Sequence, residues 1–356
     1  MIGGGESAAA PTLGVPVRRI STITPMRDER ASIDAFVADL AAQDFAGELQ
    51  VLVADGGSID GSVEQLRAAA AAAGLAIEIL DNPAGWVSPA LNACIGRATG
   101  DLIVRLDCHS RYPPDYLRRC AELAERTGAW NVGGSVLPRG TTTMERAVAC
   151  AMDSPYGGIG WTRVGGSEPI EVDTVTFGAF RPLAFERAGL FDEQLVRNQD
   201  DELNLRLRAA GGSIVLDPTL IVHYRPRGTL AGVWRQYRQY GLWKVAVMLK
   251  HRRVLTGRSM APLGLVLSIG VLLLAAPFSG SARRLLGVEL AAYLAGAVAF
   301  AVLGTRAKRE PISLAPRVGV VFPAFHLAYG LGMAQGWLRA CGRLRPRRDG
   351  GRERRR

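Results

Sequence analysis

Carboxylates and one imidazole stand at the ends of the predicted strands, where they could bind a ligand. The clearest example is the segment 100–109, an apolar run rich in Leu, Ile and Val that ends in Asp107 and His109. Such a run predicts a strand of a parallel sheet buried on both faces, and open α/β sheets bind ligands at the carboxyl ends of these strands. Asp107 and His109 are therefore candidate ligands of one cation. The alternative is that Asp107 caps the next helix and His109 is an ordinary surface residue.

Two further aspartates follow the first two predicted strands. The strand predicted over residues 18–24 is followed by Asp28, and the strand predicted over 48–54 is followed by Asp55 and two glycines. Glycines allow the backbone to turn tightly beside a ligand. Three aspartates at strand ends indicate a binding edge, although all three could also be helix-capping residues.

The elements that would position these residues alternate between strand and helix. Further strands are predicted over residues 76–80 and from Leu102, and helices over 33–40, up to Ala73 and over 88–98. Alternation with short connections is the signature of a doubly wound α/β sheet. The sequence G-x-G-x-x-G does not follow the first strand, which disfavours an NAD-binding dehydrogenase.

The alternation ends after Trp130. Strands are predicted over residues 131–137 and 172–180, and a helix is predicted near 144–152. The glycine-rich loop at 157–166 is a candidate lid, because a long loop in a compact domain is more often functional than idle.

Asp200 and Asp201 open a helix predicted over residues 198–208 and are the two candidates for a general base. On a helix Asp200 shares a face with the apolar stripe, so its carboxylate should point inward, whereas Asp201 lies nearer the boundary of that face. The helix dipole favours the ionised form of both, and both could simply cap the helix. Glu202 and Arg206 form an i, i+4 pair of the kind found on solvated faces.

Three apolar segments end the chain, at residues 259–282, 285–305 and 318–338. Each is long enough to cross about 30 Å of hydrocarbon, and a buried helical hairpin is the alternative. Three full spans are favoured, although they would place the Arg-rich C-terminal tail outside, against the positive-inside tendency; the alternative is that the third segment re-enters. The segment 230–253 mixes aromatic and basic residues, which is typical of an interfacial helix.

Length and composition exclude several classes of protein. The 356 residues suffice for one large domain with an appendage or for two domains. The net charge is +10, but residues 339–356 hold nine Arg and two acids and contribute +7, so the remainder carries only +3 and does not predict nucleic-acid binding. Five cysteines without a CxxC pair favour a reducing compartment. Residues 1–16 have no signal-peptide core and are expected to be disordered.

Taken together, five ordered stretches resemble the family 2 glycosyltransferases of the GT-A fold, over about residues 17–250. They are Thr24–Glu29, Ala54–Asp60, Arg105–His109, Phe177–Arg181 and Asn198–Leu203. The most similar branch is that of the succinoglycan-type exopolysaccharide glucosyltransferases. The expected domains are a disordered N-terminus (1–16), a Rossmann-like GT-A nucleotide-diphospho-sugar transferase domain (17–228), an interfacial amphipathic helix (229–258), a membrane domain (259–338) and a disordered Arg-rich tail (339–356).

The resemblance implies an inverting hexosyltransferase that moves a sugar, glucose being the first candidate, from a UDP-sugar to a lipid-linked saccharide. It also implies a cell membrane location with the catalytic domain in the cytoplasm. Asp55 would accept a hydrogen bond from uracil, and Arg27 would stack on the ring. The implied donor-binding residues are Thr24, Pro25, Arg27, Glu29, Asp55, Ser58, Asn92, Arg105 and Asp107.

The resemblance also assigns the cation, the base and the acceptor side. Asp107 and His109 would hold Mn²⁺ or Mg²⁺ against the diphosphate, and Asp200 or Asp201 would be the catalytic base. The implied acceptor-side residues are Gly178, Arg181, Gln236, Arg238, Tyr240 and Trp243.

Three departures from the family pattern leave alternatives open. His109 replaces the second Asp of Asp-x-Asp, which shifts preference toward Mn²⁺. Gln199-Asp200 replaces Glu-Asp, and the Gln-x-x-Arg-Trp motif of processive members survives only around Gln236, so addition of a single sugar is expected. The alternatives are a polyprenyl-phosphate sugar synthase, or an inactive nucleotide-sugar-binding sensor. The sequence does not identify any protein partner.

Overall fold

The computed structural model describes residues 15–157, 165–252 and 257–341. The predicted N-terminal disorder, most of the candidate lid loop and most of the Arg-rich tail lie outside the described residues. The described chain divides into two compact units. The first takes in residues up to 137 and from 165 to 224, and the second takes in residues 138–157 and those after 224.

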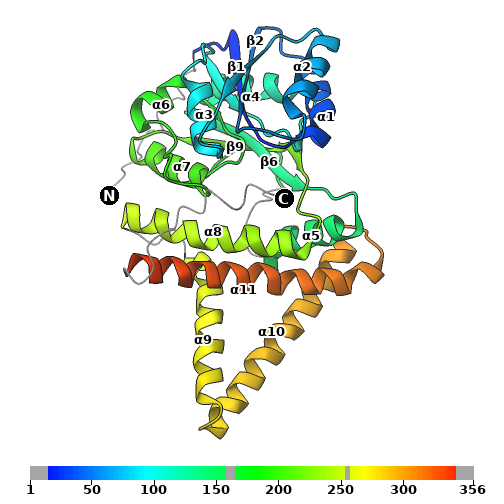
Figure 1. The fold of residues 1–356 in the computed structure, drawn as a ribbon, viewed down its shortest axis with the longest axis vertical. Helices are drawn as coiled ribbons and strands as arrows, with labels where there is room; N and C mark the ends of the chain where they lie inside the picture. The colour runs from blue at the N-terminus through cyan, green and yellow to red at the C-terminus, as the bar shows by residue number, and fades with distance from the viewer. Residues whose placement is uncertain (1–14, 158–164, 253–256, 342–356) are drawn as a thin grey trace, which may run out of the picture. The chain divides into compact units, whose positions relative to one another are not determined.

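One mixed sheet forms the centre of the first unit (Figure 1). Its order is β3-β2-β1-β4-β8-β6-β9-β5, with β7 also paired to β9. The strands β1 to β4 are parallel, and β8 is antiparallel to both β4 and β6. The strands are β1 (Arg19–Met26), β2 (Glu48–Asp55), β3 (Ile77–Asp81), β4 (Leu102–Arg105), β5 (Ser110–Arg111), β6 (Asn131–Pro138), β7 (Ile170–Glu171), β8 (Ala179–Phe180) and β9 (Ile214–Tyr224).

Six helices of the first unit pack around this sheet. They are α1 (Arg30–Ala41), α2 (Ser62–Ala72), α3 (Val87–Ile95), α4 (Tyr116–Thr127), α6 (Pro182–Ala188) and α7 (Gln199–Ala209). One buried apolar cluster joins β1, β2, α3, β8 and α7 through Ile23, Leu52, Leu91, Phe180 and Leu203. The central parallel strands β1 and β4 bury both faces, as their continuous apolar runs predict. The predicted α/β fold is confirmed.

Two sequence-based predictions in this unit are wrong. Residues 172–180 are not one strand, because only Ala179–Phe180 pairs and Phe177 before it has a positive φ of 55°. Glu202 is not on a solvated face, because it is fully buried. It pairs with Arg206, whose guanidinium also donates to the backbone carbonyls of Ala188, at the end of α6, and of Leu190. A buried carboxylate needs such a partner.

The second unit is helical. Its elements are α5 (Thr143–Asp153), η1 (Pro155–Gly157), α8 (Leu230–His251), η2 (Gly257–Met260), α9 (Ala261–Ala275), α10 (Gly280–Ala307), η3 (Ile312–Leu314) and α11 (Ala315–Ala340). Among the described residues, three helical stretches are long and apolar enough to cross a membrane: Gly257–Ala275, Gly280–Ala307 and Ile312–Ala340. Their length and composition support a membrane protein.

Within this unit, α8 and α11 lie side by side, and α9 and α10 extend away from them as a hairpin (Figure 1). A side chain at Gly332 of α11 would lie 2.0 Å from the carbonyl oxygen of Arg238 on α8, so glycine allows the close approach of the two helices. The rings of Tyr237 and Phe325 stack with centroids 4.0 Å apart. α11 therefore buries much of its surface against α8.

A hydrogen-bonded aromatic cluster fastens η1 to α10 and α11. His326 Nδ1 lies 2.9 Å from the Tyr293 hydroxyl, and His326 Nε2 lies 2.9 Å from the carbonyl oxygen of Tyr156. Because a carbonyl can only accept, Nε2 carries the proton and Nδ1 accepts from Tyr293. The Tyr156 hydroxyl in turn donates to the carbonyl of Tyr293 at 3.0 Å. These bonds satisfy polar groups in an apolar helical unit.

Glu145 joins the start of α5 to the segment that follows β9. Its side chain accepts hydrogen bonds from Thr141 N and Oγ1, from Thr142 N and from Arg225 Nε at 2.8–3.0 Å. Burial alone would raise the pKa of Glu145, but these donors lower it from the ordinary 4.5 to about 2. A depressed pKa stabilises the folded state above the ordinary pKa, and this contribution is lost as the pH falls from 4.5 toward 2.

We therefore expect Glu145→Gln to lower the midpoint of thermal unfolding by several degrees at pH 7, in line with a loss of about 1–3 kcal/mol for a buried charge-assisted network. The difference from the unchanged protein should shrink as the pH falls below 4.5. Glu122→Gln is the control, because that side chain is 58% exposed and pairs only on the surface. Equal midpoints for both variants at pH 7 would rule out this role of Glu145.

Candidate active site

The loops after β1, β2 and β4 meet at the carboxyl edge of the parallel strands. The backbone N–H of Asp28 donates to Ser58 Oγ, and the N–H of Ile59 donates back to Asp28 Oδ1, both at 2.9 Å. The loop after β4 joins them through His109, whose Nδ1 lies 2.9 Å from Glu29 Oε1. Four residues predicted to bind the sugar donor or the metal therefore lie at the carboxyl edge of the sheet: Glu29, Ser58, Asp55 and His109.

Asp55 is held in a tight turn at the end of β2. Its carboxylate accepts from the N–H of Gly57 and of Ser58 at 3.1 Å, and from Ser58 Oγ at 2.5 Å. Arg27, after the neighbouring β1, donates from Nη1 to the carbonyl of Gly85 at 3.1 Å. Gly85 has a φ of 78°, and a side chain there would lie 2.7 Å from this guanidinium. The Arg27 side chain is therefore placed by the loops after β2 and β3.

Arg105 connects the end of β4 to the start of α7. Its Nε and Nη2 atoms lie 3.1–3.2 Å from the Asp107 oxygens, and its Nη1 lies 2.5 Å from both oxygens of Asp200. The guanidinium also lies 5.8 Å from the centre of the Phe177 ring, within cation–π range. Asp200 does point inward, as its position on the predicted helix suggested, and it meets a cation there.

The charges of this cluster affect one another. Burial works against the Arg105 charge, but Asp107 and Asp200 raise the pKa of Arg105 above its ordinary range. Burial raises the pKa of Asp200 above its ordinary value, even though the Arg105 charge acts in the opposite direction. A carboxylate with a raised pKa is a stronger base than a surface aspartate.

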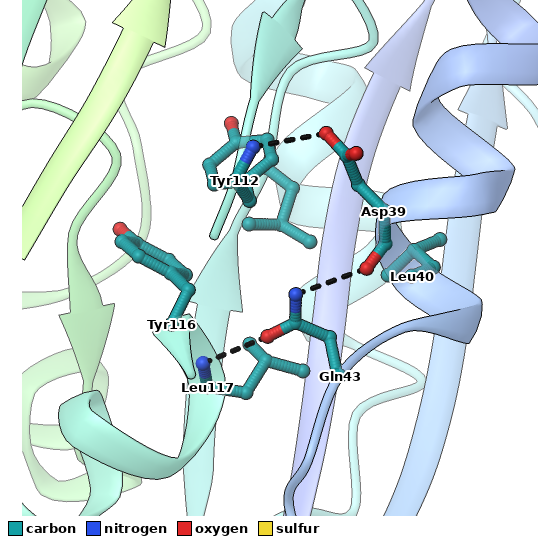
Figure 2. Close-up of a pocket in the computed structure, with 7 residues that line it drawn as sticks. Asp39, Leu40, Gln43, Tyr112, Tyr116 and Leu117 are labelled. Carbon is teal, nitrogen blue, oxygen red and sulfur yellow. Dashed lines mark hydrogen bonds between the residues drawn. The ribbon is translucent and has the colours of Figure 1, made fainter. Parts of the chain in front are cut away.

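Hydrogen bonds around a small pocket join α1 and the residue pair after it to the chain that follows β4 (Figure 2). Asp39 accepts from the N–H of Tyr112 at 3.0 Å, and Gln43 accepts from the N–H of Leu117 at 3.0 Å. The hydroxyl of the buried Tyr112 accepts from the N–H of Asp107 at 2.8 Å. These contacts position the Asp107 backbone, and the sequence signal that could have revealed them is an aspartate on the apolar face of α1.

The first turn of α7 is fixed by a chain of polar side chains. Asn131 on β6 donates to Asn204 Oδ1 at 2.8 Å, Asn204 donates to Thr174 Oγ1 at 2.8 Å, and Thr174 lies 3.4 Å from Asp201 Oδ1. Asp201 therefore faces Thr174, whereas its neighbour Asp200 faces Arg105. The two candidate bases have different surroundings.

Several predicted site residues do not gather at this edge through their side chains. Thr24 is fully buried in β1, and the Asn92 amide bonds the backbone of Phe191 in both directions. Arg181 donates to the carbonyl of Val15 at 2.7 Å, at the amino-terminal end of β1. β8 is antiparallel to β4, so this lies at the opposite end of the sheet from Asp107.

Gly178 contributes through its backbone, because its carbonyl accepts from the N–H of Arg105 at 3.0 Å. Pro25 is half-buried in β1. The other predicted acceptor-side residues lie on α8, in the second unit, where Gln236 Nε2 donates to the Tyr240 hydroxyl at 2.8 Å. They are Gln236, Arg238, Tyr240 and Trp243.

The chemistry of Asp107 and His109 suits a divalent cation that arrives with a phosphate ligand. A carboxylate oxygen and an imidazole nitrogen are both ligands that Mn²⁺ accepts. Within the described residues, no group of three or more His, Cys, Asp or Glu side chains could hold a metal ion. Because Mn²⁺ and Mg²⁺ take about six ligands, water and the phosphates of a substrate would supply those that the protein does not.

A mixed sheet has carboxylates after its parallel strands, and Arg105 joins one of them, Asp107, to Asp200 at the acidic start of α7; this is a glycosyltransferase of the GT-A fold. The chain belongs to glycosyltransferase family 2. Residues 21–181 match the family described as glycosyl transferase family 2. The chain is also 31% identical over 314 residues to the succinoglycan biosynthesis protein ExoA of Rhizobium meliloti (strain 1021), covering 87% of this chain and 92% of that protein.

Two other similarities are weaker. The undecaprenyl-phosphate 4-deoxy-4-formamido-L-arabinose transferase of Serratia proteamaculans (strain 568) is 28% identical over 124 residues, or 34% of this chain and 37% of that protein. Among solved structures, the mannosyltransferase PcManGT from Pyrobaculum calidifontis, in complex with GDP-Man and Mn²⁺, has a TM-score of 0.62 at 20% identity and covers 88% of this chain and 89% of that chain. This second similarity shows the shared fold.

Proposed function

We propose that this glycosyltransferase moves a sugar, glucose being the first candidate, from a UDP-sugar to a lipid-linked saccharide with inversion at the anomeric carbon. The observation that carries the proposal is the similarity to a succinoglycan biosynthesis protein along 92% of that protein's length. A match of this extent includes most of the helical second unit, which is where an acceptor held at a bilayer would be expected.

On the donor side, the Asp55 carboxylate accepts a hydrogen bond from uracil, and the Arg27 guanidinium stacks on the base. The turn that holds Asp55 and the bond that holds Arg27 support this assignment, because both side chains are fixed before a ligand binds. Asp107 and His109 would hold the divalent cation, which would supply positive charge to neutralise the leaving diphosphate. Glu29 orients the His109 ring through its bond to Nδ1.

On the acceptor side, Asp200 takes the proton from the acceptor hydroxyl as its oxygen attacks the anomeric carbon. The raised pKa of Asp200 supports this role, because the proton transfer becomes more favourable. The bond from Arg105 fixes the direction of the carboxylate. Asp201 remains the second candidate, with Thr174 as its partner.

Two other functions are weighed against this one. A polyprenyl-phosphate sugar synthase would use the lipid phosphate itself as acceptor, but the relatives named for such a transfer align with only about a third of this chain. An inactive nucleotide-sugar sensor would explain the altered motifs. The proposed metal ligand Asp107 and the proposed base Asp200 are both present and both pair with Arg105, which favours an enzyme.

The donor and the acceptor are tested by one screen of the full-length protein in detergent. UDP-glucose, UDP-galactose, UDP-N-acetylglucosamine and GDP-mannose are each offered with polyprenyl phosphate or with lipid-linked saccharides, and the labelled lipid is measured. We expect a UDP-sugar and a lipid-linked saccharide to give the product. Transfer from GDP-mannose alone would contradict the donor, and transfer to polyprenyl phosphate alone would contradict the acceptor.

For the membrane, we propose that α9 and α10 span the bilayer and that α8 and α11 lie at its cytoplasmic surface. In the most apolar part of each helix, 44% of the residues are buried inside the protein for α11, against 0% for α9 and 11% for α10. Much of α11 is therefore covered by the protein itself. α11 packs along α8, whose basic and aromatic residues are typical of an interfacial helix. Two spans would leave the Arg-rich tail in the cytoplasm, in agreement with the positive-inside tendency.

Cysteine labelling in intact cells tests this topology. Cys341 is the exposed cysteine at the end of α11, and we expect it to stay unlabelled by a membrane-impermeant maleimide until the cells are opened. A cysteine introduced at Ser279, between α9 and α10, should be labelled from outside in the same cells. Labelling of Cys341 in intact cells would instead support three spans.

A further inference from the structure

Arg105 uses one guanidinium for two carboxylates that have separate roles in the proposed mechanism. The side chain is only 6% exposed, and those of Asp107 and Asp200 are 14% and 24% exposed. Asp107 receives three hydrogen bonds from this group, and Asp200 receives two. The two carboxylates lie 93 residues apart in the sequence (200 − 107), so the guanidinium is what joins them.

A cation that binds Asp107 competes with Arg105 for the same oxygens. A carboxylate offers about four lone-pair positions, and three hydrogen bonds from Arg105 already use both oxygen atoms. The two positive charges also repel each other, more strongly at a poorly exposed site than in water. Asp107 therefore cannot serve the guanidinium and a divalent cation fully at the same time.

We propose that Arg105 is a positioning residue that holds Asp107 until a divalent cation arrives together with the nucleotide diphosphate, and that keeps Asp200 in place throughout. The inference rests on the proposed function, because it assigns the cation to Asp107. It changes the role predicted from the sequence, in which Arg105 contacts the donor directly.

The charge balance explains why the cation and the diphosphate arrive together. Arg105, Asp107, Asp200 and Glu29, which is bonded to His109, carry a net charge of −2. A divalent cation on Asp107 would nevertheless displace the guanidinium from that carboxylate and leave two cationic groups side by side, whereas the anionic diphosphate brings its own oxygens to the cation. Divalent metal alone should therefore bind weakly to the unchanged protein.

The surroundings of Arg105 allow it to release one carboxylate and keep the other. Its backbone N–H is bonded to the carbonyl of Gly178 at 3.0 Å, and its guanidinium lies over the Phe177 ring. Different atoms of the guanidinium serve the two carboxylates: Nη1 bonds Asp200, and Nε and Nη2 bond Asp107. Loss of the bonds to Asp107 does not require loss of those to Asp200.

The test is a titration with MnCl₂ alone, without nucleotide, followed by the electron paramagnetic resonance signal of free Mn²⁺. We expect Arg105→Gln to bind Mn²⁺ at least about tenfold more tightly than the unchanged protein, because two carboxylates then lack a counter-charge. Arg105→Lys is the matched control, since it keeps the charge and should bind Mn²⁺ as weakly as the unchanged protein. In Arg105→Gln combined with Asp107→Asn, the gain should disappear.

A purely structural role for Arg105 predicts another result. It predicts that Arg105→Gln unfolds at a lower temperature and binds Mn²⁺ no more tightly. Arg105→Met, which has a similar length and no hydrogen-bonding group, provides a second neutral variant if Arg105→Gln does not fold. Equal or weaker Mn²⁺ binding in a folded neutral variant would overturn the inference.

A failure of the role proposed for Arg105 can be told apart from a failure of the proposed function. If the unchanged protein transfers no sugar from any UDP-sugar, the proposed function fails whatever the Mn²⁺ titration gives. If it transfers sugar but the neutral Arg105 variants gain no Mn²⁺ affinity, only the role of Arg105 fails.

Discussion

Replacing Asp200 with asparagine is expected to lower the turnover number by roughly 10²–10⁴-fold, the usual contribution of a positioned general base. Asparagine has almost the same shape and can still bond to Arg105, but it cannot take a proton from the acceptor hydroxyl. Binding of UDP, measured by calorimetry, should stay nearly unchanged because Asp55 and Arg27 are fixed by other contacts.

Asp201→Asn is the matched control for this prediction. Both residues lie in the first turn of α7 and feel the same helix dipole, so a difference between them reports on their surroundings. Asp201 faces Thr174, so we expect its replacement by asparagine to lower the activity much less. If Asp201→Asn costs more than Asp200→Asn, the role of base belongs to Asp201.

Replacing Asp107 with alanine is expected to abolish metal-dependent transfer. The substitution removes the oxygen ligand of the cation, and it also leaves the Arg105 guanidinium with Asp200 alone. Transfer is measured with radiolabelled UDP-sugar in MnCl₂ and in MgCl₂. Full activity in Asp107→Ala would remove this residue from the site.

His109→Asp is the companion variant. It should retain activity and shift the preferred ion from Mn²⁺ toward Mg²⁺, because an all-oxygen ligand set suits the harder cation. An unchanged ratio of the two activities would mean that His109 does not bind the ion. Asp107 could then still be the oxygen ligand, so the two variants separate the two assignments.

The sequence predicted the strand ends well and the long-range pairs poorly. The positions of Asp55 and Asp107 follow from apolar runs and turn residues, which are local signals. The bonds from Arg105 to Asp200 join residues 95 positions apart, and no local pattern contains that information. The same is true of Asp39, which anchors the loop after β4 from a helix near the start of the chain.

Two elements show why the fold was predicted only in part. No strand is predicted from the sequence over β9, which contains Pro218, a residue that cannot donate to a strand ladder, yet the strand continues through it. Residues 172–180 have the composition of a strand, but the positive φ of Phe177 and the carbonyl of Gly178, which bonds Arg105, interrupt it beside the site. In both places tertiary contacts outweigh local propensity.

We propose that this protein transfers a sugar from a UDP-sugar to a lipid-linked saccharide. The most direct measurement supplies the purified full-length protein with radiolabelled UDP-glucose, MnCl₂ and a lipid-linked saccharide, and follows both labelled lipid and released UDP. We expect equal amounts of labelled lipid and released UDP from the unchanged protein, and loss of both in Asp107→Ala. Tight binding of UDP without turnover, with each of the UDP-sugars offered, would contradict it and indicate a nucleotide-sugar sensor.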